Sequence, residues 1–284
     1  MTSVQAAGTT FSYRQVGHRG DPLVFVHGYL GSAGIWDEVL RPLGQHHRCF
    51  AIDARGVGDS GRPVEGYTVD QWADDVLAVA DALGLDHFGY VAHSMAGLSG
   101  LRLALTRAAR LDSLVLVCPS PSGPPRAGRA AFAAFRNAWA AQDATAMAAL
   151  FTATSVHLPD PGKTAARGRV AVTAAEGHVD ALLDAAAEVD FRGQLAEVRT
   201  PTMLVLGAAD PALKAGLADY PLLPDATLHV MSGVGHVPQL ERSAEFVDVV
   251  ERFLRDGVVT FSTLMSRLTA SAERSSGPMA EQPI

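Results

Sequence analysis

The chain has few residues of the kinds that mark a disulfide-bonded, metal-binding or membrane-bound protein. Only two of its 284 residues are cysteines. Cys49 and Cys118 both stand in apolar stretches, so each is expected to be a buried thiol, which fits a reducing, cytoplasmic setting. The first residues, MTSVQAAGTTFSY, lack the basic start and apolar run of a secretion signal. No apolar stretch approaches the roughly eighteen residues that span a bilayer. These absences predict a soluble, unprocessed chain with no membrane partner.

Clusters of positive charge are absent as well. The formal net charge is -7 and no run of lysines or arginines occurs, so nothing in the sequence would follow a phosphate backbone. Nucleic acid is therefore not an expected partner, and a small-molecule substrate is the partner to look for. Composition does not decide whether the chain forms a homo-oligomer, which stays open.

What the sequence does contain is enough apolar surface, 48% of its residues, for a large core. Four short apolar runs, at 23–26, 88–92, 114–118 and 203–206, are continuous and do not alternate with polar residues. Strands of a parallel sheet have this pattern, because helices cover both of its faces. The sequence therefore predicts the α/β class, with a mostly parallel sheet flanked by helices.

One crossover helix is clearly marked. Thr68 with Gln71 three residues later forms a capping box, and apolar residues then recur on one helical face until Gly84. The last helix of the core is expected at about 243–255, where the sequence is amphipathic.

The strand and helix rhythm breaks at PSPSGPP, and the next seventy or so residues are alanine-rich and helical in pattern. We therefore expect an α/β core formed by residues 1–118 and 200–257, with a helical cap inserted at 119–199. Residues 258–284 form a C-terminal extension. Its apolar residues near 261–268 allow one more docked helix, and its polar end is expected to be disordered.

Ser94 stands where the strand 88–92 meets the next helix, in AHSMAG. A serine at such a turn has an exposed hydroxyl, and the helix N-terminus behind it offers N–H groups to a developing oxyanion. The turn needs small residues two before and two after the serine, and Ala92 and Ala96 fill these places where the usual pattern G-x-S-x-G has glycines. An isolated serine more often caps a helix, but the flanking strand and helix indicate a nucleophile.

A serine nucleophile needs a base that a carboxylate holds in place. Asp210 follows the strand 203–206, and His236 lies in a glycine-rich loop after a strand near 227–231. Each has an ordinary alternative, a turn residue for Asp210 and a solvated loop residue for His236. The order Ser, Asp, His, with each member after a separate strand, favours a catalytic triad of Ser94, His236 and Asp210.

An oxyanion hole needs a second N–H group from the loop after an earlier strand. That loop begins with His27 and Gly28, and we expect the main-chain N–H groups of Tyr29 and Met95 to form the hole. His27 is interpreted as a structural brace, and His93 as a residue of the pocket wall or one that points away. The other histidines show no spacing of metal ligands, so no metal is expected.

Taken with these residues, Asp53–Ser60 (DARGVGDS) and Gly235–Glu241 (GHVPQLE) make the chain resemble the α/β-hydrolase superfamily, from about Phe11 to Arg255. The resemblance is to cap-bearing members such as esterases, enol-lactonases, C–C bond hydrolases and cofactor-free haloperoxidase-like proteins. Dehalogenase and epoxide hydrolase members have an aspartate where Ser94 stands, so the chain does not resemble those. The resemblance implies acyl transfer through an acyl-enzyme, with His236 as base and no cofactor.

Aromatic and apolar residues of the cap and of the loops near the site are expected to line the substrate pocket. For any single one, packing of the cap onto the core is the alternative. The candidates are Trp36, Phe132, Phe135, Trp139, Phe151 and Val237. No basic residue marks a carboxylate clamp, so the expected substrate is an uncharged or weakly polar ester, lactone or thioester. A C–C hydrolase with the same triad, or a ligand-binding or cyclase protein with a repurposed triad, remains the alternative.

Overall fold

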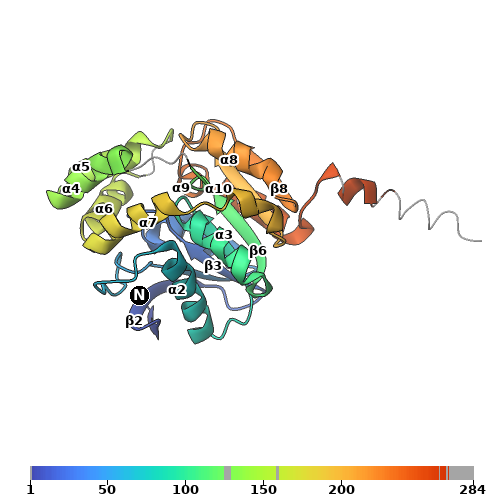
Figure 1. The fold of residues 1–284 in the computed structure, drawn as a ribbon, viewed down its shortest axis with the longest axis horizontal. Coiled ribbons are helices and arrows are strands. Elements are labelled where there is room, and N and C mark those ends of the chain that lie inside the picture. Colours follow the sequence, from blue (N-terminus) through green and yellow to red (C-terminus); the bar gives the residue numbers. More distant parts are fainter. Residues whose placement is uncertain (1, 125–128, 158–159, 262, 267, 269–284) are drawn as a thin grey trace, which may run out of the picture.

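An eight-stranded sheet forms the centre of the molecule, with helices on both sides (Figure 1). The structure is a computed structural model and describes residues 2–124, 129–157, 160–261, 263–266 and 268. The strands are β1 (Thr2–Ala6), β2 (Thr9–Val16), β3 (Pro22–Val26), β4 (Arg48–Ile52), β5 (Phe88–His93), β6 (Leu111–Val117), β7 (Thr202–Gly207) and β8 (Ala226–Met231).

Helices connect these strands and make up most of the chain between β6 and β7. The α-helices are α1 (Asp37–Leu43), α2 (Val69–Ala82), α3 (Ala96–Thr106), α4 (Ala133–Ala140), α5 (Ala144–Ala153), α6 (Pro161–Val172), α7 (Leu182–Glu188), α8 (Leu213–Asp219), α9 (Pro238–Glu241) and α10 (Ser243–Asp256). Short 3-10 turns are η1 (Ala33–Trp36), η2 (Ala108–Arg110), η3 (Arg129–Phe132), η5 (Arg192–Glu197) and η6 (Tyr220–Leu222), and η4 (Gly177–Ala181) is a π-helical turn.

The strand order is β1-β2-β4-β3-β5-β6-β7-β8. Strands β3 to β8 run parallel to one another, and β1 and β2 form an antiparallel hairpin whose second strand pairs antiparallel with β4. The mostly parallel sheet predicted from the apolar runs is confirmed. Its parallel strands all end at one edge, and the loops that leave this edge carry the candidate site.

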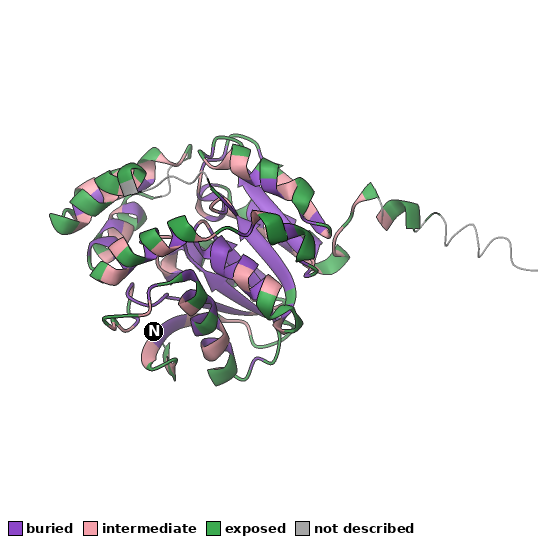
Figure 2. Ribbon diagram, viewed as in Figure 1, coloured by how far each residue is buried: buried purple, intermediate pink, exposed green. Residues whose placement is uncertain are grey.

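Two apolar clusters cover the two faces of the sheet, and single strands contribute to both (Figure 2). In β3, Val24 and Val26 belong to the cluster with α2, α3 and the later helices, and Leu23 and Phe25 belong to the cluster with α1 and α10. Because side chains alternate across a strand, a strand buried on both faces needs an unbroken apolar sequence. This explains why β3, β5, β6 and β7 were recognisable as continuous apolar runs.

Helix α2 begins where the capping box predicts, with one difference. The side-chain oxygen of Thr68 accepts the N–H of Gln71 at 3.0 Å. The side chain of Gln71 does not return to Thr68; its Nε2 donates to Asp75 at 2.9 Å. Asp75 is buried and binds Arg55, whose Nε lies 2.7 Å from the carboxylate. A buried ion pair therefore recruits the glutamine that the sequence pattern assigns to the cap.

Helices α4, α5, α6 and α7, called the cap helices below, lie above the carboxyl edge of the sheet in Figure 1. Contacts with the core hold them there. The hydroxyl of Tyr29, in the loop after β3, donates to the carbonyl of Val179 at 3.0 Å. The main-chain N–H of His236, after β8, donates to the carbonyl of Thr154 at 2.8 Å. The insertion thus touches two of the loops that leave the edge.

The chain after α10 turns away from the sheet (Figure 1). Phe261 is 77% exposed and Leu268 is 64% exposed, so the helical residues described there do not dock on the core. The expected disorder of the polar end falls on residues 269–284, which lie outside the described part of the chain. Among the described residues, no helix is both long and apolar enough to cross a membrane.

Close contact between two cap helices yields a first prediction. A Cβ atom added at Gly168 of α6 would lie 2.2 Å from the carbonyl oxygen of Ala144 at the start of α5. We expect Gly168→Ala to force the helices apart, cost about 1–3 kcal/mol and lower the melting temperature by several degrees. Gly193 is the matched control, because a Cβ there meets nothing within 4 Å. Thermal unfolding followed by circular dichroism would contradict the packing argument if the two variants melted together.

Candidate active site

Three loops at the carboxyl edge of the sheet bring Ser94, Asp210 and His236 together. Ser94 follows β5, Asp210 follows β7 and His236 follows β8. The Oγ of Ser94 lies 3.0 Å from Nε2 of His236, and Nδ1 of His236 lies 3.0 Å from Oδ1 of Asp210. With the imidazole proton on Nδ1, that N–H donates to Asp210 and the serine hydroxyl donates to Nε2. The geometry is that of a nucleophile, a base and a carboxylate in line.

The backbone of Ser94 is in the left-handed region, with a φ of 55°. Ala92 and Ala96 on either side are fully buried, so only small residues fit beside this turn. Main-chain bonds hold it, because the N–H of Ser94 donates to Val117 at 2.9 Å and its carbonyl accepts from Gly97 at 2.9 Å. The turn points Oγ towards His236 and away from its own helix.

The loop after β3 passes directly beside Ser94. A Cβ added at Gly28 would lie 2.7 Å from Cβ of Ser94, so only glycine allows this approach. Tyr29 is the next residue, and Met95 is the N-cap residue of α3. The structure therefore places both residues proposed for the oxyanion hole on the main-chain segments that flank Ser94, and their role stays a prediction.

Asp210 is buried, with 5% of its surface exposed. Burial by itself would raise its pKa, but the hydrogen bond and charge of His236, together with the N–H of Ala212 and the thiol of Cys118, outweigh burial and lower the pKa. Asp210 is therefore ionised at neutral pH and stabilises positive charge on the imidazole of His236.

Cys118 at the end of β6 lies next to this carboxylate. Its Sγ accepts the N–H of Gly207 at 3.4 Å. Together with Asp210 and His236 it forms a group whose potential ligand atoms lie within 4.8 Å of one another. A thiol must lose its proton to bind a metal, whereas burial and the charge of Asp210 raise the pKa of Cys118 well above its ordinary value. The chemistry of this donor set therefore does not favour a metal. As predicted, both cysteines are buried free thiols.

Three more histidines are buried around the site and bind main-chain groups. Nε2 of His27 accepts the N–H of Ala54 at 3.0 Å, as expected for a structural brace. Nε2 of His93 lies 2.8 Å from the carbonyl of His236, and the two rings are 4.9 Å apart. Nε2 of His178, from the insertion, accepts the N–H of Leu30 at 3.4 Å. His93 thus supports the loop of His236 and has no direct contact with Ser94 Oγ of the kind that a base needs.

Glu241 is a residue to which the sequence assigned no role. Its buried carboxylate accepts four main-chain N–H groups, those of Gly235, Val237, Val156 and His157, at 2.8–3.3 Å. Two of these belong to the loop of His236 and two to the segment after α5. One carboxylate thus fixes the His236 loop and the insertion to each other. Its place in the segment Gly235–Glu241 was the only signal available in the sequence.

The expectation that Trp36 lines the pocket is wrong. Its side chain is fully buried on the other face of the sheet, with its ring centroid 5.3 Å from that of Phe25 and 6.3 Å from that of Phe246. The turn η1 carries the residue back against α1 and α10, where it packs in the core. The hydrophobic pattern of the sequence does not show on which of the two faces of the sheet an apolar side chain lies.

The other aromatic candidates gather above Tyr29. Its ring lies 5.3 Å from that of Phe132 and 6.5 Å from that of Phe135, and Phe135 lies 5.7 Å from Phe151. Together these four rings are called the aromatic wall below. Trp139 donates its indole N–H to the carbonyl of Ala174 at 2.8 Å and so fastens α4 to the end of α6. Val237 is buried beside His236, with 2% of its surface exposed.

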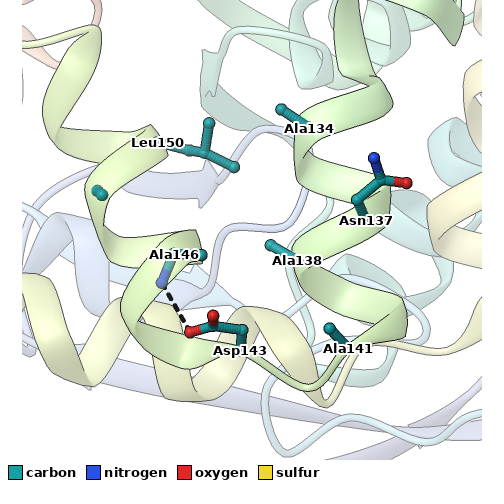
Figure 3. Close-up of a pocket in the computed structure, with 8 residues that line it drawn as sticks. Ala134, Asn137, Ala138, Ala141, Asp143, Ala146 and Leu150 are labelled. Atoms are coloured by element: carbon teal, nitrogen blue, oxygen red, sulfur yellow. Dashed lines mark hydrogen bonds between the residues drawn. The ribbon is translucent and has the colours of Figure 1, made fainter.

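A separate groove of about 490 Å³ lies between α4 and α5 (Figure 3). Small side chains dominate its lining, and Asp143 at one end caps α5 by accepting the N–H of Ala146 (Figure 3). None of the predicted site residues lines it. The lining residues are Ala134, Asn137, Ala138, Ala141, Asp143, Ala146, Ala149 and Leu150.

Comparison with known proteins shows the family to which the chain belongs. The model of the family described as alpha/beta hydrolase fold matches residues 21–243, and the chain belongs to that family. The N-formylmaleamate deformylase of Pseudomonas putida is 30% identical over 248 residues, covering 83% of this chain and 89% of that protein. The non-heme chloroperoxidase of Streptomyces lividans is 30% identical over 255 residues, with coverage of 83% and 92%.

Among solved structures, the enol-lactonase from Burkholderia xenovorans LB400 superposes with a TM-score of 0.79 at 22% identity, covering 89% of this chain and 100% of that one. At that identity the likeness concerns the fold alone. The family resemblance inferred from the sequence motifs is confirmed.

The buried histidines predict how stability depends on pH. Burial lowers the pKa of His93 and of His178 to about 3, and it also lowers the pKa of His27. Below the ordinary histidine pKa of about 6.5 the unfolded chain binds protons that the folded chain does not. The free energy of unfolding should therefore fall as the pH is lowered from 6.5 to 5, by up to about 1.4 kcal/mol per pH unit for each histidine.

Urea unfolding at a series of pH values measures this slope. His178→Gln should reduce the slope by about one proton, and His18→Gln, which replaces a histidine at an exposed position, is the control. An unaltered slope in His178→Gln would show that the imidazole at 178 is protonated in the folded protein.

The contacts of Glu241 predict a local loss of order. Glu241→Ala leaves four main-chain N–H groups without their acceptor, at a cost of about 1–3 kcal/mol for each one that stays buried and unpaired. We expect a lower melting temperature and faster hydrogen–deuterium exchange at 154–157 and 234–237, while exchange in β5 and β6 stays slow. Glu245→Ala is the control, because that glutamate is exposed on α10. Equal exchange in the two variants would contradict the fastening role.

Proposed function

We propose that the protein is a serine hydrolase that cleaves an ester, lactone or thioester of a mainly apolar small molecule through an acyl-enzyme. One observation carries the proposal: the continuous hydrogen-bonded series Ser94, His236 and Asp210, which starts at a serine held in a left-handed turn. The name of the deformylase relative describes removal of an acyl group, the formyl group of N-formylmaleamate, which agrees with this reaction class.

In the proposed reaction Ser94 Oγ attacks the substrate carbonyl carbon while Nε2 of His236 takes its proton. The ionised Asp210 stabilises the imidazolium that results. The tetrahedral intermediate collapses when His236 returns the proton to the leaving group, which departs and leaves the acyl group on Oγ. Water then attacks the acyl-enzyme with His236 again as base, and the acid product and free Ser94 are released.

The oxyanion of each tetrahedral intermediate is assigned to the main-chain N–H groups of Tyr29 and Met95. The close approach of Gly28 to Ser94 supports this assignment, because it brings the loop after β3 against the turn before α3. One such donor typically contributes about 10²- to 10³-fold to the rate.

We assign separate roles to the α/β core and to the inserted helices. Residues 1–118 and 200–257 carry the triad, and the insertion at 119–199 covers it and supplies apolar side chains. The aromatic wall supports this assignment, since it joins Tyr29 of the core to Phe132, Phe135 and Phe151 of the insertion.

Labelling with a fluorophosphonate probe tests the proposal. The probe forms a bond to an activated serine, so peptide mass spectrometry should find the label on Ser94. Ser94→Ala should lose the label, and its turnover of a p-nitrophenyl ester should fall by about 10⁴- to 10⁶-fold. Ser3→Ala, an exposed position on β1, should behave as the unaltered protein does.

Absence of label on the folded, unaltered protein would overturn the proposal in favour of a binding or cyclase function. Label on Ser94 with turnover of 1,3-diketones, and none of esters, lactones or thioesters, would replace it with C–C bond hydrolysis.

A further inference from the structure

One arginine of the insertion, Arg167, has no acidic partner among the residues that the structure describes. Arg167 lies on α6, and none of its nitrogens forms an ion pair or a hydrogen bond with any residue that the structure describes. Its Nε is enclosed and unsatisfied. The other cations of the same helix differ, because Lys163 pairs with Glu38 and Arg169 is exposed to solvent.

The guanidinium of Arg167 stacks on the aromatic wall. Its central carbon lies 4.6 Å from the ring centroid of Phe151. From Phe151 the ring contacts continue through Phe135 to Tyr29, the residue next to the loop position that touches Ser94. A continuous series of contacts therefore leads from Arg167 through the aromatic wall to the loop beside Ser94.

A second route connects Arg167 to the triad. Phe151 is three residues before Thr154, whose carbonyl accepts the N–H of His236. The charge of Arg167 also acts on the residues of the site. The pKa of His93 is lowered first by burial, then by the charge of His236, and further by the charge of Arg167. The cation thus lies within electrostatic reach of the residues around the nucleophile.

Burying a cation without a counter-ion is unfavourable. Burial lowers the pKa of Arg167 to about 10, and no carboxylate acts against it, yet the side chain still carries its charge at neutral pH. A cation–π contact with Phe151 offsets part of the cost, by about 0.5–2 kcal/mol. Arg167 is only partly exposed to solvent, and its enclosed Nε has no acceptor among the described residues, which points to a ligand as the missing partner.

We propose that Arg167 binds a carboxylate of the substrate, so that the enzyme acts on acyl compounds with an apolar body and an acidic group at the end remote from the reacting carbonyl. The planar guanidinium matches a carboxylate with two parallel N–H donors. The inference rests on the proposed hydrolase function. It differs from the expectation of an uncharged substrate, which was based on the absence of a basic residue that stands out in the sequence as a carboxylate clamp.

A matched pair of esters tests the inference. The p-nitrophenyl monoester of glutaric acid carries a terminal carboxylate, and p-nitrophenyl valerate has the same chain length without one. The unaltered enzyme should prefer the acidic ester. Arg167→Met should lower kcat/KM for the acidic ester by about 10- to 150-fold, the range for hydrogen bonds to a charged group, and change kcat/KM for the neutral ester less than threefold. Arg167→Lys should retain part of the preference.

Arg169→Met is the control, since it removes the same charge from an exposed position of the same helix. Fluorophosphonate labelling of Ser94 in each variant shows that it is folded and that the nucleophile is active. Equal losses on both esters in Arg167→Met, or no preference for the acidic ester in the unaltered enzyme, would overturn the carboxylate proposal while leaving the hydrolase proposal intact. Failure of the hydrolase proposal is distinguished by absence of label and of turnover of either ester.

A binding measurement tests the role of Arg167 without relying on turnover. Glutarate should bind Ser94→Ala about 10- to 150-fold more tightly than it binds Ser94→Ala with Arg167→Met. Equal affinities in isothermal titration calorimetry would contradict the role of Arg167.

Discussion

The left-handed backbone of Ser94 costs about 1–3 kcal/mol in a residue other than glycine, and the surrounding structure has to hold it. The N–H of Ser94 is bound by Val117 of the neighbouring strand, and its carbonyl accepts the N–H groups of Gly97 and Ser120. Gly28 approaches from the other side so closely that a methyl group would overlap Ser94. A strand, a helix and two loops therefore meet at one residue. The same crowding that holds the left-handed turn also places the hydroxyl at the sheet edge, within 3.0 Å of Nε2 of His236.

The loop of His236, the proposed base, is held by the carboxylate of Glu241, which accepts main-chain N–H groups. Glu241 binds two N–H groups of the His236 loop and two of the segment after α5, while His236 itself donates to Thr154. The insertion consequently has no freedom to move away from the His236 loop without breaking these bonds. In the proposed reaction, the position of the base therefore depends on the placement of the insertion. The same contacts would orient both the proposed pocket wall and the proposed base.

Ser94 and Asp210 were predictable because each follows a strand with an unbroken apolar sequence, and because parallel strands end at one edge. His236 follows β8, which includes the polar residues Thr227 and His229, so the glycine-rich loop and the chain order indicated it instead. The direction in which a side chain faces could not be predicted in the same way. Trp36 is an aromatic residue of the kind that lines apolar pockets, but η1 directs its side chain to the face of the sheet that α1 and α10 cover. No sequence periodicity distinguishes the two faces of a sheet that helices cover on both sides. Arg167 was hidden for the same reason, since whether a cation has a partner is decided by tertiary contacts. The antiparallel hairpin of β1 and β2 was also missed, because these strands are half exposed and carry no continuous apolar run.

Arg55 and Arg167 both have shifted pKa values, but for opposite reasons. Arg55 is buried against Asp75, and that hydrogen bond raises its pKa; the pair is complete and needs nothing from a ligand. Arg167 has no such partner in the described part of the chain, and Asp210, the carboxylate of the candidate site, is already bound to His236. The site is consequently polarised, with a carboxylate beneath the imidazole and a cation at the far end of the aromatic wall. If the proposed carboxylate entered with the opposite orientation, it would approach Asp210 and lose the guanidinium. In the proposed complex, only the orientation that pairs the carboxylate with Arg167 leaves the carbonyl at Ser94, so the proposed recognition charge would also select the bond presented to the proposed nucleophile.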